Sequence, residues 1–257
     1  MTSAALFDVS GRVGLITGAA AGLGFAMAEA LSENGARVVL FDQDATQLSK
    51  SVSDFQISGG EVMGIAGDVT QADAMSAAVE RTLERFGRLD IVIANAGISD
   101  PDRAMLHETS HEGWQRVVDV NLNGVFNTCH AALKPMMAQR SGKIITVASM
   151  WGLVGAAGLQ PRPAYSATKG AVVNLTREMA VEYAAFGIQI NALCPGFFHT
   201  TGRPRNAVQA AEFEAYTPMG RIAEPSEIKG SVLYLASSAS DFVTGTTLVI
   251  DGGVVAR

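Results

Sequence analysis

The chain has 257 residues, of which 48% are hydrophobic and 17% are charged, and its formal net charge is -6. This composition is typical of a well-buried globular enzyme and argues against a disordered or fibrous chain. The acidic balance, with no basic run anywhere, disfavours a nucleic acid or an anionic membrane surface as a partner. No apolar stretch approaches the ~18 residues that a membrane-spanning helix needs, so we expect a soluble protein.

The cysteines and histidines bear on compartment and metal binding. Cys129 and Cys194 each lie in an apolar segment, which indicates buried thiols in a reducing compartment. The amino terminus also lacks the pattern of a signal peptide, so we expect a cytoplasmic protein. The four histidines form no cluster with the cysteines, and no metal site is predicted.

Short apolar runs alternate with helical patterns along the chain. Strands are predicted at residues 13–17, 37–41, 61–66, 90–94, 143–147, 188–193 and 247–250. Helices are predicted at residues 25–32, 45–55, 72–86, 112–139, 165–185, 207–216 and 225–236. Pro135 is expected to bend or end the last part of its helix. Residues 197–221 are otherwise irregular, and we expect them to form a mobile flap over the substrate.

The strand pattern predicts the fold class. The predicted strands are rich in Val and Ile without polar alternation, which favours a parallel sheet covered by helices on both faces. Right-handed crossovers make such a sheet doubly wound, which predicts a Rossmann-type α/β fold of about seven strands. With no repeat, low-complexity tract or linker, we expect residues 1–257 to form one domain.

Polar or turn-forming residues follow most of the predicted strands directly. They are Gly18, Asp42, Asp68, Asn95, Ser149 and Pro195-Gly196. Strands often end in turn formers, which explains one or two of these positions. Six positions with complementary chemistry favour instead a ligand site at the carboxyl edge of the sheet, where open α/β sheets bind their ligands.

The glycine-rich turn from Gly18 to Gly24 predicts a dinucleotide site. Backbone amides at the start of a helix, with the positive end of its dipole, suit a pyrophosphate. The Gly-x-x-x-Gly-x-Gly spacing differs from the common dinucleotide fingerprint. At the end of the second strand, Asp42 can accept hydrogen bonds from a ribose diol and would repel a 2′-phosphate, so NAD is favoured over NADP.

Tyr165 and Lys169 form a candidate acid–base pair. They lie one helical turn apart and therefore share a helix face. A cation at that distance favours the phenolate and lowers the pKa of a tyrosine. Such a tyrosine can take a proton from an alcohol or return one to a carbonyl. The pair by itself is common on solvated helices, so its meaning depends on the other motifs.

As an ordered set, these residues resemble the short-chain dehydrogenase/reductase family over residues 11–253. The matching motifs are Thr17-Gly18-x-x-x-Gly22-x-Gly24, Asp68-Val69, Asn95-Ala96-Gly97, Asn121, Ser149, Tyr165-x-x-x-Lys169, Pro195-Gly196 and Asp251-Gly252-Gly253. The resemblance implies cofactor contacts from Gly18, Gly22, Leu23, Gly24, Asp42, Asp68, Val69, Asn95, Ala96, Gly97, Tyr165, Lys169, Pro195, Gly196 and Thr200.

The resemblance also implies the catalytic roles. Ser149 would hydrogen-bond the substrate oxygen and Tyr165 would be the acid–base group. Lys169 would bind the nicotinamide ribose and lower the tyrosine pKa, and Asn121 would hold a water in the proton relay. It further implies a homotetramer, with one interface formed by helix pairs near residues 112–139 and 165–185.

Two departures from the family pattern concern the substrate side. Ala148 stands where many members have a second serine, and the interval from Ser149 to Tyr165 is longer than usual. The extra length falls in residues 158–163, which should border the substrate, and a longer interval is similar to some polyol and sugar dehydrogenases. Candidate pocket residues are Ser99, Met150, Trp151, Gln160, Arg162, Phe197, Phe198 and His199.

The sequence therefore predicts an NAD-dependent enzyme that interconverts a secondary alcohol and a ketone. The expected substrate is a small polar alcohol such as a polyol or a sugar. One alternative is a 3-oxoacyl thioester reductase, although Asp42 argues against the NADPH that such enzymes usually take. The other alternative is a dinucleotide-binding regulator that keeps the fold without catalysis.

Overall fold

A parallel β-sheet forms the centre of the computed structural model, which describes residues 2–102, 104–156, 158–200 and 206–257. In these ranges seven strands pair in the order β3-β2-β1-β4-β5-β6-β7. They are β1 (Val13–Thr17), β2 (Arg37–Asp42), β3 (Val62–Ala66), β4 (Ile91–Ala94), β5 (Gly142–Val147), β6 (Ile188–Pro195) and β7 (Thr247–Ile250).

The strand order reverses between β1 and β4. The chain builds β1, β2 and β3 outward in one direction and then returns to place β4 on the other side of β1. The connections after β1 and β4 therefore lead to helices on opposite faces of the sheet, and the carboxyl edge at this reversal is where doubly wound sheets bind ligands. The predicted Rossmann-type α/β fold is confirmed.

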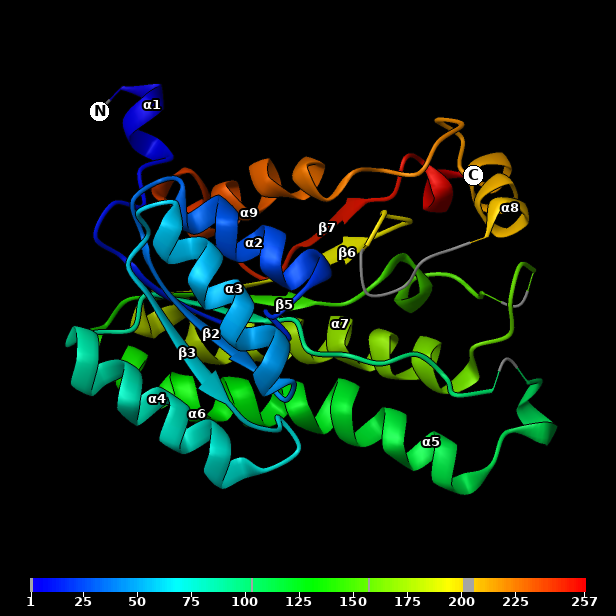
Figure 1. The fold of residues 1–257 in the computed structure, drawn as a ribbon, viewed down its shortest axis with the longest axis horizontal. Helices are drawn as coiled ribbons and strands as arrows, with labels where there is room; N and C mark the ends of the chain where they lie inside the picture. The colour runs from blue at the N-terminus through cyan, green and yellow to red at the C-terminus, as the bar shows by residue number, and fades with distance from the viewer. Residues whose placement is uncertain (1, 103, 157, 201–205) are drawn as a thin grey trace.

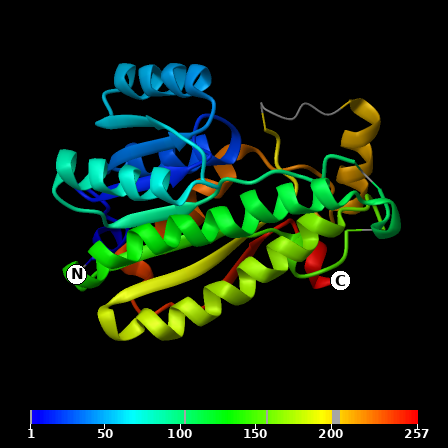
Figure 2. The same cartoon turned by 90° about the horizontal axis from the view of Figure 1, so that it is seen from below.

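Helices cover both faces of the sheet. In the described residues these are α1 (Ser3–Leu6), α2 (Gly22–Ser32), α3 (Ala45–Ile57), α4 (Ala72–Phe86), α5 (His111–Val118), α6 (Gly124–Gln139), α7 (Pro163–Tyr183), α8 (Ala207–Tyr216) and α9 (Lys229–Ala236). One face carries α2, α3 and α9, and the other carries α4, α6 and α7 (Figures 1 and 2). Among the described helices, none has the length and apolarity to cross a lipid bilayer.

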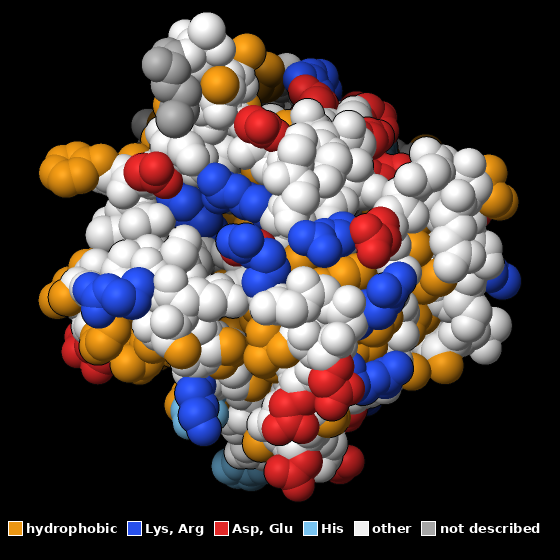
Figure 3. All heavy atoms as spheres, turned by 90° about the vertical axis from the view of Figure 1, so that its left-hand side faces the viewer, with side chains coloured by type: hydrophobic (Ala, Val, Ile, Leu, Met, Phe, Trp, Pro, Cys, Tyr) orange, Lys and Arg blue, Asp and Glu red, His pale blue; other side chains and the backbone are white. Residues whose placement is uncertain are grey.

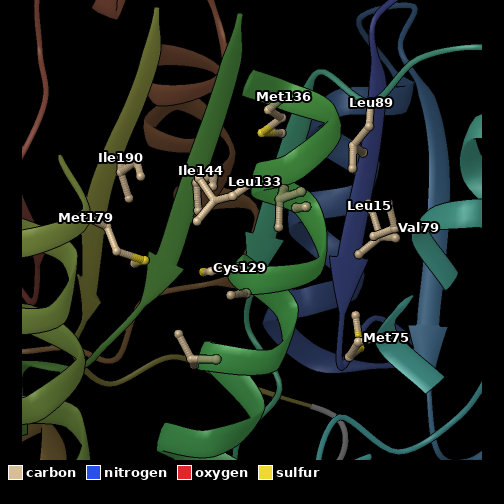
Figure 4. Close-up of a cluster of buried hydrophobic side chains, with 14 of the residues drawn as sticks. Leu15, Met75, Val79, Leu89, Cys129, Leu133, Met136, Ile144, Met179 and Ile190 are labelled. Atoms are coloured by element: carbon tan, nitrogen blue, oxygen red, sulfur yellow. The ribbon is translucent and has the colours of Figure 1, made fainter. Parts of the chain in front are cut away.

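Two apolar layers hold the helices against the sheet. Successive residues of a strand point to opposite faces, so Leu15 enters the layer under α4, α6 and α7, while Ile16 enters the layer under α2 and α9. Figure 4 shows Leu15, Leu133 and Ile144 in the first of these layers. All five residues of β1 are buried, which accounts for the unbroken apolar run in the sequence.

Several element boundaries differ from the sequence-based prediction. Residues 112–139 are helical, but a π-helical turn, Asp119–Asn123, separates α5 from α6. Helix α6 continues through Pro135 to Gln139, so the proline does not end it. Helix α2 begins at Gly22, inside the glycine-rich turn, and β6 continues through Pro195. Strand and helix ends depend on tertiary hydrogen bonds, which local propensity does not report.

The amino edge of the sheet is tied by ion pairs. Figure 3 faces this edge and shows Lys and Arg side chains interspersed with Asp and Glu. Asp90 accepts from Arg88 at 2.7 Å and from the backbone amide of Val13 at 2.9 Å, which joins the starts of β1 and β4. The ammonium of Lys143 lies 2.8 Å from Asp241, and burial lowers the pKa of this lysine. These ion pairs and hydrogen bonds join the starts of the strands to one another and to neighbouring segments.

Leu15→Ala tests the importance of the layer beneath α6. The side chain is fully buried, so its truncation should leave a cavity and lower the free energy of unfolding by about 2–5 kcal/mol. Urea denaturation followed by circular dichroism measures the change. Leu106→Ala, the same substitution at an exposed residue, should change it by less than about 0.5 kcal/mol. Equal effects of the two substitutions would contradict the packing described above.

Candidate active site

A cleft of about 420 Å³ opens at the carboxyl edge of the sheet. The predicted site residues that line it are Gly18, Gly22, Leu23, Gly24, Asp42, Asp68, Val69, Asn95, Ala96, Gly97, Ser149, Tyr165, Lys169, Pro195, Gly196 and Thr200. Among the residues predicted to be catalytic or to bind the cofactor, Asn121 alone does not line it. Positions from the whole length of the chain therefore converge on one crevice, because parallel strands end at one edge of their sheet.

The turn after β1 is shaped by glycine. Gly18 and Gly22 have φ values of +64° and +60°, a region that residues with a Cβ rarely adopt. A Cβ atom on Gly24 would collide with the carbonyl oxygen of Gly18 and lie 2.6 Å from Nδ2 of Asn95. That amide nitrogen donates to the carbonyls of Thr17 and Gly18 at 2.8 and 3.1 Å. The glycines thus allow the turn to pack directly against the loop after β4.

The residues on this side of the cleft fit a dinucleotide. The turn leads into the start of α2, where no side chain of the described residues caps the helix, so its first amides can receive a diphosphate. Asp42, at the end of β2, accepts from the amides of Ala20 and Asp44, both at 3.0 Å. These bonds hold the carboxylate at the cleft wall, and a carboxylate has further lone pairs for a ribose diol.

Ser149, Tyr165 and Lys169 come together at the other side of the cleft. Ser149 follows β5, and its hydroxyl accepts from the amide of Trp151 at 3.2 Å. Tyr165 and Lys169 lie on α7, with Nζ of the lysine 5.7 Å from the centroid of the tyrosine ring. The ammonium also donates to the carbonyl of Val147 at 2.6 Å, which ties α7 to the end of β5. A hydroxyl pair with an adjacent cation can bind and deprotonate an alcohol.

Asn121 lies behind the cleft in the π-helical turn and is fully buried. Its Oδ1 accepts from the amide of Ile98 at 2.8 Å, and its Nδ2 donates to the carbonyl of the same residue at 2.9 Å. A Cβ atom on Gly97 would lie 3.3 Å from this Oδ1 and 3.4 Å from Nζ of Lys169, so both groups flank that glycine. The asparagine therefore anchors the loop after β4 next to the lysine.

The remaining wall of the cleft is mostly apolar. Of the candidate pocket residues, Met150, Trp151, Arg162, Phe197 and Phe198 line the cleft. Phe213, on α8, also lines it, and its ring stacks on that of Phe197 with centroids 4.2 Å apart. The sequence placed this helix in the flap but did not mark Phe213 as a pocket residue, because an apolar residue on a short helix ordinarily belongs to the hydrophobic core. Residues 201–205 of the predicted flap lie outside the described ranges.

Three other candidate pocket residues stand back from the cleft wall. Ser99 and Gln160 accept hydrogen bonds from Arg162, at 3.0 and 2.7 Å. His199 is half exposed, and its Nε2 lies 3.9 Å from a carboxylate oxygen of Glu224. Their place is therefore beside the pocket, where they position or flank the residues that line it.

Known proteins resemble this chain over nearly its full length. A family model described as enoyl-(acyl carrier protein) reductase matches residues 18–255. The chain is 41% identical over 250 residues to cis-4-hydroxycyclohexanecarboxylate dehydrogenase of Sinomonas cyclohexanicum, which covers 95% of this chain and 97% of that protein. The structure of a short-chain type dehydrogenase/reductase from Mycobacterium marinum matches with a TM-score of 0.95 and 37% identity, and it covers both chains completely. This chain belongs to the short-chain dehydrogenase/reductase family.

A further solved relative shows a bound nucleotide. Gluconate 5-dehydrogenase from Burkholderia cenocepacia, in complex with NADP and tartrate, matches with a TM-score of 0.92 and 35% identity, and it also covers both chains completely. Members of the family bind a nicotinamide dinucleotide and interconvert secondary alcohols and carbonyl compounds. The chain is accordingly an oxidoreductase of this class, a short-chain dehydrogenase/reductase with a small-molecule substrate.

The cysteines of this short-chain dehydrogenase/reductase do not provide a nucleophile. Burial raises the pKa of Cys129 to about 12 and that of Cys194 to about 11. Both thiols therefore stay protonated at neutral pH, where a thiol is a weak nucleophile. Within the described ranges there is also no group of three His, Cys, Asp or Glu side chains placed to hold a metal ion.

Asp100 is a functional residue that sequence analysis missed. Its carboxylate is buried, and its two oxygens accept from the amides of Ala164 and Tyr165, both at 3.0 Å. It therefore caps α7 from the loop after β4, and a negative charge at a helix start is also favoured by the helix dipole. The sequence carries Pro163 as a helix-start signal, but it carries none for a cap supplied from the distant position 100.

Asp100→Ala should loosen the turn that holds Tyr165. Loss of both acceptors should lower the free energy of unfolding by about 1–2 kcal/mol and, by displacing the tyrosine, reduce kcat at least about tenfold. Chemical denaturation and steady-state kinetics measure the two effects. Asp100→Asn retains one acceptor, so its free energy of unfolding and its kcat should lie between those of the unmodified enzyme and of Asp100→Ala. Asp102→Ala, at an exposed neighbour, should change neither quantity. Full activity of Asp100→Ala would show that the cap does not position the tyrosine.

Proposed function

We propose that this short-chain dehydrogenase/reductase is an NAD-dependent enzyme that interconverts a polar secondary alcohol, such as a polyol or sugar derivative, and the corresponding ketone. The observation that carries the proposal is that Ser149, Tyr165 and Lys169 line the same cleft as the glycine turn. The names of the relatives support the substrate class, because one oxidises a hydroxylated ring carboxylate and another is a gluconate dehydrogenase.

The proposed chemistry assigns one task to each side chain. The nicotinamide ring, when bound, supplies the two-electron chemistry of the reaction. In the direction of oxidation, the hydroxyl group of Ser149 holds the alcohol oxygen and the ionised oxygen of Tyr165 takes its proton. Lys169, whose Nζ lies 5.7 Å from the centroid of the tyrosine ring, would hold the nicotinamide ribose. Asn121, whose side chain is bonded to Ile98, would hold a water of the proton relay.

The preference for NAD rests on Asp42. Its carboxylate lies in the cleft wall at the end of β2, held by two backbone amides. A fixed negative charge there would accept hydrogen bonds from an adenosine ribose and repel a 2′-phosphate. The structure of gluconate 5-dehydrogenase contains NADP, so a relative takes the phosphorylated cofactor, and in this chain the choice of NAD would depend on Asp42.

The proposal also includes a single domain, a homotetramer and a cytoplasmic location. One sheet runs from β1 to β7, which supports a single domain over residues 1–257. Phe126 on α6 and Val181 on α7 are exposed apolar side chains, which supports the use of these helices as interfaces of a homotetramer. Two buried thiols suit a reducing compartment such as the cytoplasm.

A 3-oxoacyl thioester reductase is the second candidate. The description of the matching family model, which names an acyl carrier protein, favours it. An absorbance assay at 340 nm separates the candidates, with NAD and polyols in one arm and NADPH and an acetoacetyl thioester in the other. A dinucleotide-binding regulator would bind NAD but show no turnover in either arm.

Tyr165→Phe tests the proposed acid–base residue. Removal of one hydroxyl should lower kcat by about 10²- to 10⁴-fold and leave the NAD dissociation constant, measured by fluorescence titration, within about threefold. Tyr183→Phe, the same change at the far end of α7, should keep full activity. Near-normal turnover of Tyr165→Phe would refute the assignment of the base.

Asp42→Ala tests the basis of cofactor choice. Loss of the carboxylate should reduce the ratio of kcat/KM with NAD to that with NADP at least about tenfold, since charge repulsion at this range is worth more than about 1.4 kcal/mol. Steady-state kinetics with both cofactors measure the ratio. Asp54→Ala, at an exposed residue of α3, should leave it unchanged. An unaltered ratio in Asp42→Ala would mean that another group discriminates.

A further inference from the structure

A small apolar cluster lies beside the cleft, apart from the two layers that cover the sheet. Its buried members are Met150, Trp151, Ala156 and Val254. The partly buried side chains packed against them are Leu159, Tyr165, Phe197, Tyr216 and Val255. These residues come from the turn after β5, the start of α7, the segment after β6, the end of α8 and the residues after β7. The cluster therefore joins the proposed acid–base tyrosine to α8 and to the segment after β7.

Tyr216 supports the aromatic wall of the cleft from behind. Its ring centroid lies 5.9 Å from that of Trp151 and 6.3 Å from that of Phe197. Both of those rings line the cleft, whereas Tyr216 is not among the described residues that line it. Steeply inclined aromatic rings at such distances attract one another. Loss of the Tyr216 ring would therefore free the wall to move, although no ligand in the cleft touches that ring.

A cation from the segment after β7 covers the ring of Tyr216. The guanidinium carbon of Arg257 lies 4.2 Å from the centroid of this ring. Figure 1 shows the same arrangement, with the end of the chain beside α8. A guanidinium that stacks on an aromatic face is attracted by the electrons of the ring. Arg257 thus contacts Tyr216 in addition to the two rings of the wall.

The turn after β7 carries this arginine to α8. Asp251 accepts from the amides of Gly253 and Val255 through its two oxygens, both at 2.8 Å. The carbonyl of Gly252 accepts from the amide of Met219 at 3.1 Å, which ties the turn to the segment after α8. Gly252 and Gly253 have φ values of +65° and +95°, which favour glycine. The Asp-Gly-Gly motif, to which the sequence assigns no role, thus builds the support of α8.

We propose that Tyr216, held by Arg257 and by the turn after β7, positions the aromatic wall of the substrate pocket. Tyr216 is a positioning residue, because it acts through Trp151 and Phe197. The wall orients an alcohol for the reaction at Tyr165, and a displacement of about 1 Å can cost about 10² in rate. The inference rests on the proposed function for the alcohol that the wall receives, whereas the position of the wall can be measured without substrate.

Tyr216→Ala removes the supporting ring, and Tyr216→Phe is the conservative variant that keeps it. With NAD and D-sorbitol, galactitol or cyclohexanol as probes, Tyr216→Ala should lower kcat/KM at least about tenfold, mostly through KM. The dissociation constant of NAD, and KM in Tyr216→Phe, should stay within about threefold of the unmodified values. Tyr183→Ala, the same truncation at the far end of α7, should leave KM unchanged. A purely structural effect would reduce the folded fraction and kcat but not change KM.

Trp151 reports the position of the wall without substrate. The chain contains two tryptophans, so Trp114→Phe leaves Trp151 as the fluorescent one. In that background Tyr216→Ala should open a cavity beside the indole, raise its acrylamide quenching constant at least about twofold and shift its emission to longer wavelength. Tyr216→Phe and Tyr183→Ala should change neither property. Circular dichroism of each variant monitors the fold.

Arg257→Gln tests whether the cation acts through the ring. In the unmodified chain it should raise KM about two- to fivefold, the effect expected of one exposed cation–π contact. In Tyr216→Ala the same substitution should change KM by less than about 1.5-fold, because the ring that couples the two sites is gone. Arg257→Lys keeps the charge and should retain part of the effect. Equal changes in the two backgrounds would show that the arginine does not act through Tyr216.

Each contrary outcome has a separate meaning. If Tyr216→Ala leaves KM or the quenching of Trp151 unchanged, or if Tyr183→Ala changes them as much, the inference is overturned and the proposed function stands. If Tyr216→Ala does not fold, Arg257→Gln decides, and an unchanged KM in that variant overturns the inference. If none of the alcohols reduces NAD, the proposed function falls, and the quenching of Trp151 alone then decides the inference.

Discussion

The loop that follows β4 is the constraint on which the site depends. Its Asn95 bonds to the glycine turn after β1, and its Ile98 exchanges two hydrogen bonds with Asn121 in the π-helical turn. Two residues later, Asp100 caps the helix that carries Tyr165. One short piece of backbone therefore fixes the dinucleotide side of the cleft, the buried asparagine and the tyrosine relative to one another. A shift in any of these contacts would misalign groups whose chemistry requires close placement.

The loop can act this way because the sheet beneath it is rigid. Every residue of β1 and β4 is buried, and these two strands pair in parallel at the point where strand order reverses. At the amino edge, Asp90 joins the starts of the same two strands. Dense packing and this double attachment leave the loops after β1 and β4 little freedom to separate. The cleft is thus a consequence of topology, and the glycines at positions 18 and 24 let its two walls approach.

Charge is distributed unevenly along the cleft. Carboxylates line the side where an adenosine ribose would bind, whereas Lys169 and Arg162 lie on the side of the reacting hydroxyls. In the proposed function, this uneven charge would help to orient an elongated ligand along the cleft. The aromatic wall, with Phe213 contributed by α8, lowers the local dielectric around the cations and strengthens their interactions. In the proposed function, cofactor choice and substrate choice would depend on separate residues of this crevice.

The fold and most of the lining residues could be predicted from local patterns. The apolar runs predicted the seven strands, and the polar residues that follow them, such as Gly18, Asp42 and Ser149, predicted a site at the carboxyl edge. The Tyr165–Lys169 spacing predicted a shared helix face, because a turn and a helix face are encoded by neighbouring residues. Tertiary structure decided the rest. The anchoring of Asn121 to Ile98, the remote cap from Asp100 and the orientation of Arg162 by Ser99 arise from bonds between residues far apart in the chain. Such bonds leave no periodicity in the sequence, because they form only when the folded sheet brings its loops together.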